Sequence, residues 1–135
     1  MKKKTKKLAS FSLAEILIVL AIIGILIMLV LPNQTGVATK TKSLEAQQEL
    51  KMIYSLENTY YLQYSKYTSN FSELDYIPHK NINQGGTANY EIVIVEATSQ
   101  GFKARAIAVN DFNGNGVKNT WDIDQNGIIK ETQKD

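Results

Sequence analysis

The sequence predicts an α+β protein in which a long N-terminal α-helix, first transmembrane and then amphipathic, packs against a small antiparallel β-sheet. Residues 11–31 form an apolar run that is long enough for a membrane helix. Residues 37–64 then place apolar side chains at helical spacing. Residues 90–131 hold β-rich runs separated by turn residues. Four antiparallel strands laid on the amphipathic helix would bury its apolar stripe and complete one domain.

The apolar run is interrupted by one charge. At about 1.5 Å per residue, a helix over residues 11–31 spans about 31 Å, which is the thickness of a bilayer core. The lone carboxylate of Glu15 is costly in lipid unless it lies at headgroup level. Gly24 lowers helix propensity, and Pro32 kinks or ends a helix. Alternatively, Gly24 is a close-packing position and Pro32 a simple helix end.

A basic leader, MKKKTKKLAS, precedes the apolar run. Its five lysines favour retention of the N-terminus in the cytoplasm. Without residues 1–10, the chain has 10 basic against 13 acidic residues and a net charge of −3. No basic patch remains and Arg105 is the single arginine, so direct nucleic-acid binding is not predicted. An ordinary secretory signal does not fit an apolar region of this length with Glu15 at its front.

The order of basic leader, small residue, Phe11, Ser12 and then Glu15 resembles the class III signal of type IV pilins and pseudopilins. The resemblance implies a pilin fold, and cleavage between Ser10 and Phe11 by a prepilin peptidase that also N-methylates Phe11. It divides the chain into a leader (1–10), a transmembrane and filament-core helix (11–32) and a globular head (33–135).

The resemblance also implies roles within the helix and exposes two departures from the family pattern. Glu15 would set subunit register during assembly, and Gly24 and Pro32 would bracket a segment that melts on assembly. Ser10 stands where glycine is usual before the cut. The chain has no cysteine, whereas many type IV pilins close their C-terminal region with a disulfide. Other interactions must therefore hold that end of the head.

The head is predicted to begin with an amphipathic helix from about residue 37 to Tyr64. Glu57 interrupts its apolar row, which consists of Ala46, Leu50, Ile53, Tyr60 and Tyr64. Residues 65–88 are predicted to form a packed loop that is held by Tyr67, Phe71, Leu74, Tyr76 and Ile77.

Five tyrosines gather towards the end of the predicted helix and just after it, at positions 54, 60, 61, 64 and 67. Packing of amphipathic rings explains them, with an array for charge transport as the alternative.

Two β-hairpins are predicted after this loop. Residues 90–96 and 102–109 form the first, around a break at residues 99–101. Residues 120–124 and 128–131 form the second, around Asn126-Gly127, because Asn-Gly is a strong hairpin-turn signal.

The segment between the hairpins fits the start of a calcium loop. The pattern D-x-[DN]-x-[DN]-G directs alternate side-chain oxygens at one centre, while glycine permits a sharp turn. The alternative is that these are ordinary turn residues between strands. The candidate ligands are Asp111, Asn113, Asn115, the carbonyl of Val117, and Asp122 in place of the expected glutamate.

Enzymatic activity is not predicted. The head lacks a cysteine nucleophile and a phosphate-cradling loop, and the lone His79 is predicted to be a surface residue. Scattered carboxylates do not indicate a catalytic pair.

The resemblance implies a structural subunit of a type IV pilus that serves motility, adhesion or DNA uptake. Its partners would be copies of itself and related pilins, the prepilin peptidase, and an inner-membrane assembly platform. The precursor would be a single-pass inner-membrane protein, and the product an extracellular pilus or a periplasm-spanning pseudopilus. The alternatives are a pseudopilin of a type II secretion or competence system and, in another class, a membrane-tethered binding module.

Overall fold

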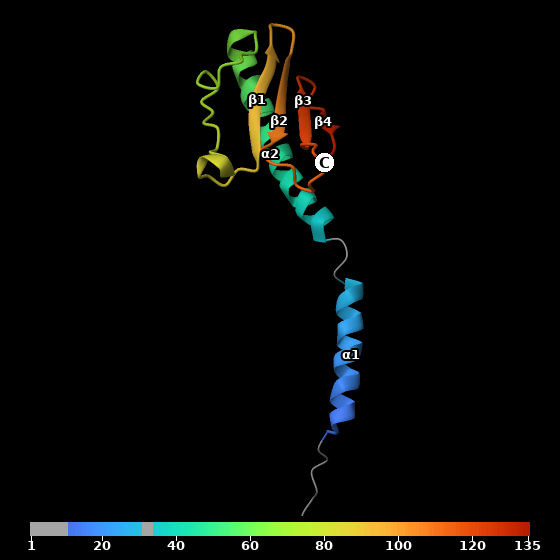
Figure 1. Cartoon of the computed structure of the whole chain (residues 1–135). Coiled ribbons are helices and arrows are strands. Elements are labelled where there is room, and N and C mark those ends of the chain that lie inside the picture. Colours follow the sequence, from blue (N-terminus) through green and yellow to red (C-terminus); the bar gives the residue numbers. More distant parts are fainter. Residues whose placement is uncertain (1–10, 31–33) are drawn as a thin grey trace, which may run out of the picture. The chain divides into compact units, whose positions relative to one another are not determined.

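The computed structural model of the chain describes residues 11–30 and 34–135. These residues belong to two compact units, Met1–Gln34 and Thr35–Asp135. The first unit contains helix α1 (Leu13–Val30). The second contains most of helix α2 (Gln34–Tyr64), the short 3-10 helix η1 (Ile82–Gln84) and a four-stranded sheet (Figure 1).

Helix α1 is apolar over its whole circumference. Glu15 is its only charged residue, and none of its residues is buried. Its 18 residues span about 27 Å, so by length and composition this helix can cross a membrane.

Helix α2 begins at Gln34, three residues before the predicted start near residue 37, and ends at Tyr64 as predicted. The described residues hold α1 and α2 as separate elements, in keeping with the predicted restart of the helix after Pro32. Residues 31–33, which include Pro32, lie outside the described residues.

The sheet is an antiparallel meander in the order β1-β2-β3-β4. Its strands are β1 (Tyr90–Ala97), β2 (Phe102–Ala108), β3 (Thr120–Asp124) and β4 (Ile129–Gln133). Both predicted hairpins are confirmed, with strand ends that differ by at most two residues. Gly127 adopts a left-handed φ of 73° in the second turn, a conformation that favours glycine.

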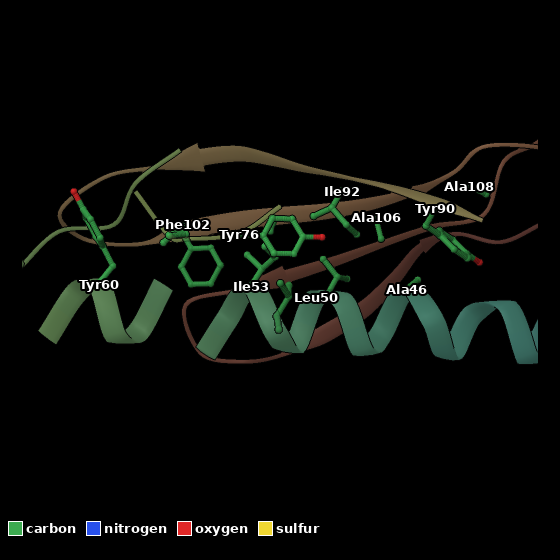
Figure 2. Packing of buried hydrophobic residues seen from close by; sticks show 13 residues of the cluster. Ala46, Leu50, Ile53, Tyr60, Tyr76, Tyr90, Ile92, Phe102, Ala106 and Ala108 are labelled. Atoms are coloured by element: carbon green, nitrogen blue, oxygen red, sulfur yellow. The ribbon is translucent and has the colours of Figure 1, made fainter. Parts of the chain in front are cut away.

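The core of the head lies between α2 and one face of the sheet (Figure 2). Ala46, Leu50 and Ile53 of α2 are fully buried. The inward residues of β2 after Phe102 are small, which lets the helix lie close to the sheet; they are Ala104, Ala106 and Ala108. The α+β prediction is therefore confirmed.

Two predicted core residues are exposed instead. Tyr64 is 58% exposed, because its ring lies at the end of α2 and contacts Tyr60 with ring centroids 4.5 Å apart. Ile77 is 86% exposed, although Leu74 and Tyr76 in the same segment are buried as predicted. Conversely, Glu57 is fully buried.

Asn119, at the entrance to β3, joins three strands through its side chain and is only 1% exposed. Its Oδ1 accepts hydrogen bonds from the Tyr90 hydroxyl at 2.7 Å and the Trp121 indole at 2.6 Å. Its Nδ2 donates to Glu131 Oε1 at 2.7 Å and to the Gln133 carbonyl at 3.3 Å. This buried network ties β4, the last strand of the chain, to β1 and β3 without a disulfide.

Asn119→Ala should destabilise the head by roughly 2–4 kcal/mol, because it leaves buried donors and acceptors on several strands without partners. The fluorescence of Trp121, the only tryptophan, reports unfolding of the full-length chain in detergent micelles. Asn83→Ala, at an exposed position on η1, is the matched control and should change stability by less than about 0.5 kcal/mol. Equal stability of the two variants would contradict the role of Asn119.

Candidate functional site

The N-terminus of α1 is organised by a capping box. The Ser12 backbone N–H donates to Glu15 Oε2 at 2.7 Å, and the Glu15 backbone N–H donates to Ser12 Oγ at 3.3 Å. The first bond satisfies the Ser12 N–H, and the second adds to the bond from the Glu15 N–H to the Ser12 carbonyl at 3.1 Å. They explain why the helix begins at Leu13, directly after Ser12.

This cap holds the carboxylate beside the predicted cleavage junction. Glu15 Oε2 accepts the backbone N–H of Ser12, and Ser12 directly follows Phe11, whose nitrogen would become the new amine. The Glu15 side chain is exposed, and Phe11 is 83% exposed. A cation from another molecule can therefore approach the carboxylate. Ser10, on the other side of the junction, lies outside the described residues.

Gly24 lies in the middle of α1 and does not interrupt the helix. A Cβ added at Gly24 would meet no atom of the chain within 4 Å. Nothing within the described part of the subunit therefore requires glycine here. Pro32, its predicted partner in a yielding segment, is not among the described residues.

In the predicted calcium loop, the carboxylate of Asp111 accepts hydrogen bonds from the loop's own backbone. Asp111 Oδ1 accepts the backbone N–H groups of Asn113 at 3.1 Å and Gly114 at 2.7 Å, and Oδ2 accepts that of Gly116 at 2.5 Å. The Gly116 bond is the largest of several causes that lower the pKa of Asp111. Gly114 and Gly116 have positive φ, which lets their N–H groups turn inward.

The side chains of the other predicted ligands also have protein partners, and Asn113 Oδ1 accepts the backbone N–H of Asn115 at 2.9 Å. Asn115 Oδ1 accepts the backbone N–H of Val117 at 2.7 Å. Asp122 lies in β3 opposite Arg105 of β2, and both its oxygens bond the guanidinium, at 2.7 and 2.8 Å. Within the described ranges, no three His, Cys, Asp or Glu residues are grouped to hold a metal ion. These partners favour the alternative that the segment is an ordinary turn, and the calcium site stays a prediction.

Phe112 fastens this loop to the head, and sequence reasoning missed it. The Lys42 ammonium of α2 lies 4.1 Å from the centroid of its ring. Its ring also meets that of Tyr90 edge-on at 5.8 Å. Its backbone N–H donates to Asp135 Oδ2 at 2.7 Å. An aromatic residue within the turn Asp111-Phe112-Asn113-Gly114 is the signal that could have predicted this anchor.

Three of the five tyrosines pack as a group beside Phe102. The ring centroids of Tyr54 and Tyr67 lie 6.4 and 5.1 Å from that of Phe102, and Tyr61 stacks on Tyr67 at 4.8 Å. These contacts support the packing interpretation of the tyrosines.

His79 lies at the surface, as predicted. Its side chain is largely exposed, and its Nε2 lies 3.5 Å from Glu49 Oε1.

No protein-family model matches the chain, but a curated protein is similar to it. The chain is 31% identical over 75 residues to the type IV major pilin protein PilA of Myxococcus xanthus. The aligned region is 56% of this chain, which spans about a third of the relative's length. Over the aligned region, the chain is therefore similar to a type IV pilin.

Millimolar calcium should leave the melting temperature of the full-length chain in detergent micelles equal to that in EDTA, because the loop oxygens already have protein partners. Trp121, in the strand that carries Asp122, reports the transition. Asp111→Asn, which keeps a side-chain oxygen for the turn, is the control variant. A calcium-dependent rise of several degrees that Asp111→Asn abolishes would restore the calcium site.

Proposed function

We propose that this chain is a structural subunit of a type IV pilus that is processed at its N-terminus and polymerises through α1. The observation that carries the proposal is a wholly apolar, uncovered helix that opens on a capped carboxylate. A helix that is apolar all round needs an apolar environment, which a bilayer and a bundle of like helices both supply.

Processing would begin with hydrolysis of the Ser10–Phe11 peptide bond by a prepilin peptidase. The leader with its five lysines would leave, and the new amine of Phe11 would be methylated. The cut falls before Leu13, so α1 stays on the product. The exposure of Phe11 is consistent with access to this junction.

The uncut subunit would wait in the inner membrane with α1 across the bilayer, because the leader's positive charge favours the cytoplasmic side. An assembly platform would then move it into a filament. Burial of α1 among the helices of neighbouring copies would replace its contacts with lipid, and packing between the helices would supply most of the cohesion.

Glu15 would set the register of this packing. An α-amino group has a pKa of about 8, so the amine of Phe11 is cationic at neutral pH, and methylation preserves its charge. A carboxylate and an ammonium buried in a low-dielectric filament core each need a partner. The amine of a neighbouring copy would be the partner of Glu15 and would replace its cap on Ser12, or would share the carboxylate with it.

Electron microscopy of cells with and without this chain tests the proposed function. Long surface filaments that disappear with the chain support a pilus subunit. Loss of secretion or DNA uptake without loss of surface filaments would indicate a pseudopilin instead.

Glu15→Gln should remove the charge of Glu15 and keep its role in the capping box at the start of α1. Glutamine also serves in a capping box, so α1 and cleavage before Phe11 should persist. Filament yield should nevertheless fall at least about tenfold, since breaking a buried ion pair costs about 3–5 kcal/mol. Mass spectrometry of the membrane fraction measures cleavage, and the amount of protein in sheared filaments measures assembly.

Glu15→Ala, which removes both cap and charge, is the companion variant and should assemble no better than Glu15→Gln. Wild-type filament yield from Glu15→Gln would rule out the ion pair and leave Glu15 with its capping role alone.

A further inference from the structure

Glu57 is a buried acid in the apolar stripe of α2. It lies between Ile53 and Tyr60 on the face that packs into the head, and its exposed fraction is 0%. Two other carboxylates on α2, Glu45 and Glu49, retain partial exposure. Burying a carboxylate is costly unless it is protonated or fully hydrogen-bonded, so its contacts decide its charge.

The two oxygens of Glu57 differ in their contacts. Oε2 accepts the backbone N–H of Thr68 at 3.1 Å. Oε1 is buried and has no hydrogen-bond partner among the described residues. One amide donor does not compensate a buried negative charge, whereas a protonated carboxyl carries no net charge to compensate.

Thr68 joins this acid to a second one. Its hydroxyl donates to Glu73 Oε2, which also accepts the hydroxyl of Tyr60 at 3.0 Å. Glu57 and Glu73 therefore both hydrogen-bond Thr68, which lies near the start of the segment 66–76. Glu73 is exposed, so water stabilises its charge, and Glu57 is the member of the pair that depends on a proton.

Among the described residues, the groups around Glu57 offer no cation to balance its charge. Tyr60 on α2 and Tyr67 on the loop carry neutral hydroxyls, and the charge of Glu57 is one of the causes that raise their pKa values. Lys66 acts on Glu73 rather than on Glu57. The sheet contributes apolar residues such as Phe102 and Ala104 to the same core. Burial accordingly raises the pKa of Glu57 to about 7, while the Thr68 hydrogen bond opposes the rise.

We propose that Glu57 is a proton-operated latch for the segment 66–76. Protonated Glu57 holds Thr68 against α2. Loss of the proton leaves a buried anion with a single donor, and detachment of the segment lets water reach it. Phe71 and Tyr76 of this segment line a cavity of about 490 Å³ beside Glu45 and Glu49. The latch would therefore couple ambient pH to the shape of this face of the head.

The direction of the pH effect follows from the raised pKa. The folded head holds its proton more tightly than the unfolded chain, whose glutamate titrates near its ordinary value of 4.5. The stabilisation by Glu57 is complete below that value and is lost as pH rises through about 7. The segment should therefore be closed at pH 5 and open more often at pH 8.

Hydrogen exchange of the full-length chain in detergent micelles tests the latch, after correction for the intrinsic effect of pH. Protection of amides 66–76, and of Thr68 above all, should fall several-fold between pH 5 and pH 8 relative to amides of β2. Protection that is unchanged across this range would overturn the proposal. This measurement on the wild-type chain needs no variant to fold.

Glu57→Gln supplies the matched variant, because glutamine has the shape of the protonated acid and cannot ionise. It should melt several degrees above wild type at pH 8 and equally at pH 5, with constant protection of residues 66–76. Glu96→Gln, which alters an exposed carboxylate on β1, should keep the wild-type pH dependence. A wild-type pH dependence in Glu57→Gln would assign the effect to another group.

Discussion

The constraint on which the molecule depends is the uncovered apolar surface of α1. None of its residues is buried within the described chain, and its one charge is committed to the cap at its start. Water cannot accommodate such a helix at low free energy, so it has to lie in lipid or among other apolar helices. The proposed life cycle of the subunit is a passage between these two environments. The capping box joins the two stages, because it places a carboxylate beside the position where cleavage would create an amine.

The head solves a different problem, which is to remain closed without a disulfide. Burial of the α2 stripe against the small side chains of β2 provides the core. Asn119 then ties the last strand to the others, while Arg105 and Asp122 link β2 to β3. Phe112 holds the acidic loop against α2 through Lys42. Each contact is modest, but together they fix the region that a disulfide fixes in many type IV pilins. Glu57 is the exception, because it places a group in the core whose stabilisation depends on pH.

The fold class and the strand positions could be predicted because they follow from local signals. Apolar periodicity located α2, and the Asn126-Gly127 turn located the second hairpin. The burial of individual residues depended on tertiary context. Tyr64 has helical spacing but is exposed at the end of α2, and Glu57 is polar but fully buried. The calcium pattern alone cannot separate a metal site from a turn, because Asp and Asn oxygens serve equally well as acceptors for a turn's own N–H groups. At Asp122, pairing with Arg105 follows from strand register, which residue spacing within the loop cannot reveal.

The claim that α1 is both membrane anchor and filament core requires that the chain lose its leader and keep its helix. The most direct test is mass spectrometry of the N-terminal peptide of this protein from purified surface filaments. We predict a chain that begins at N-methylated Phe11 and continues unbroken through α1. Filament protein that retains residues 1–10, or that begins after residue 31, would contradict the account.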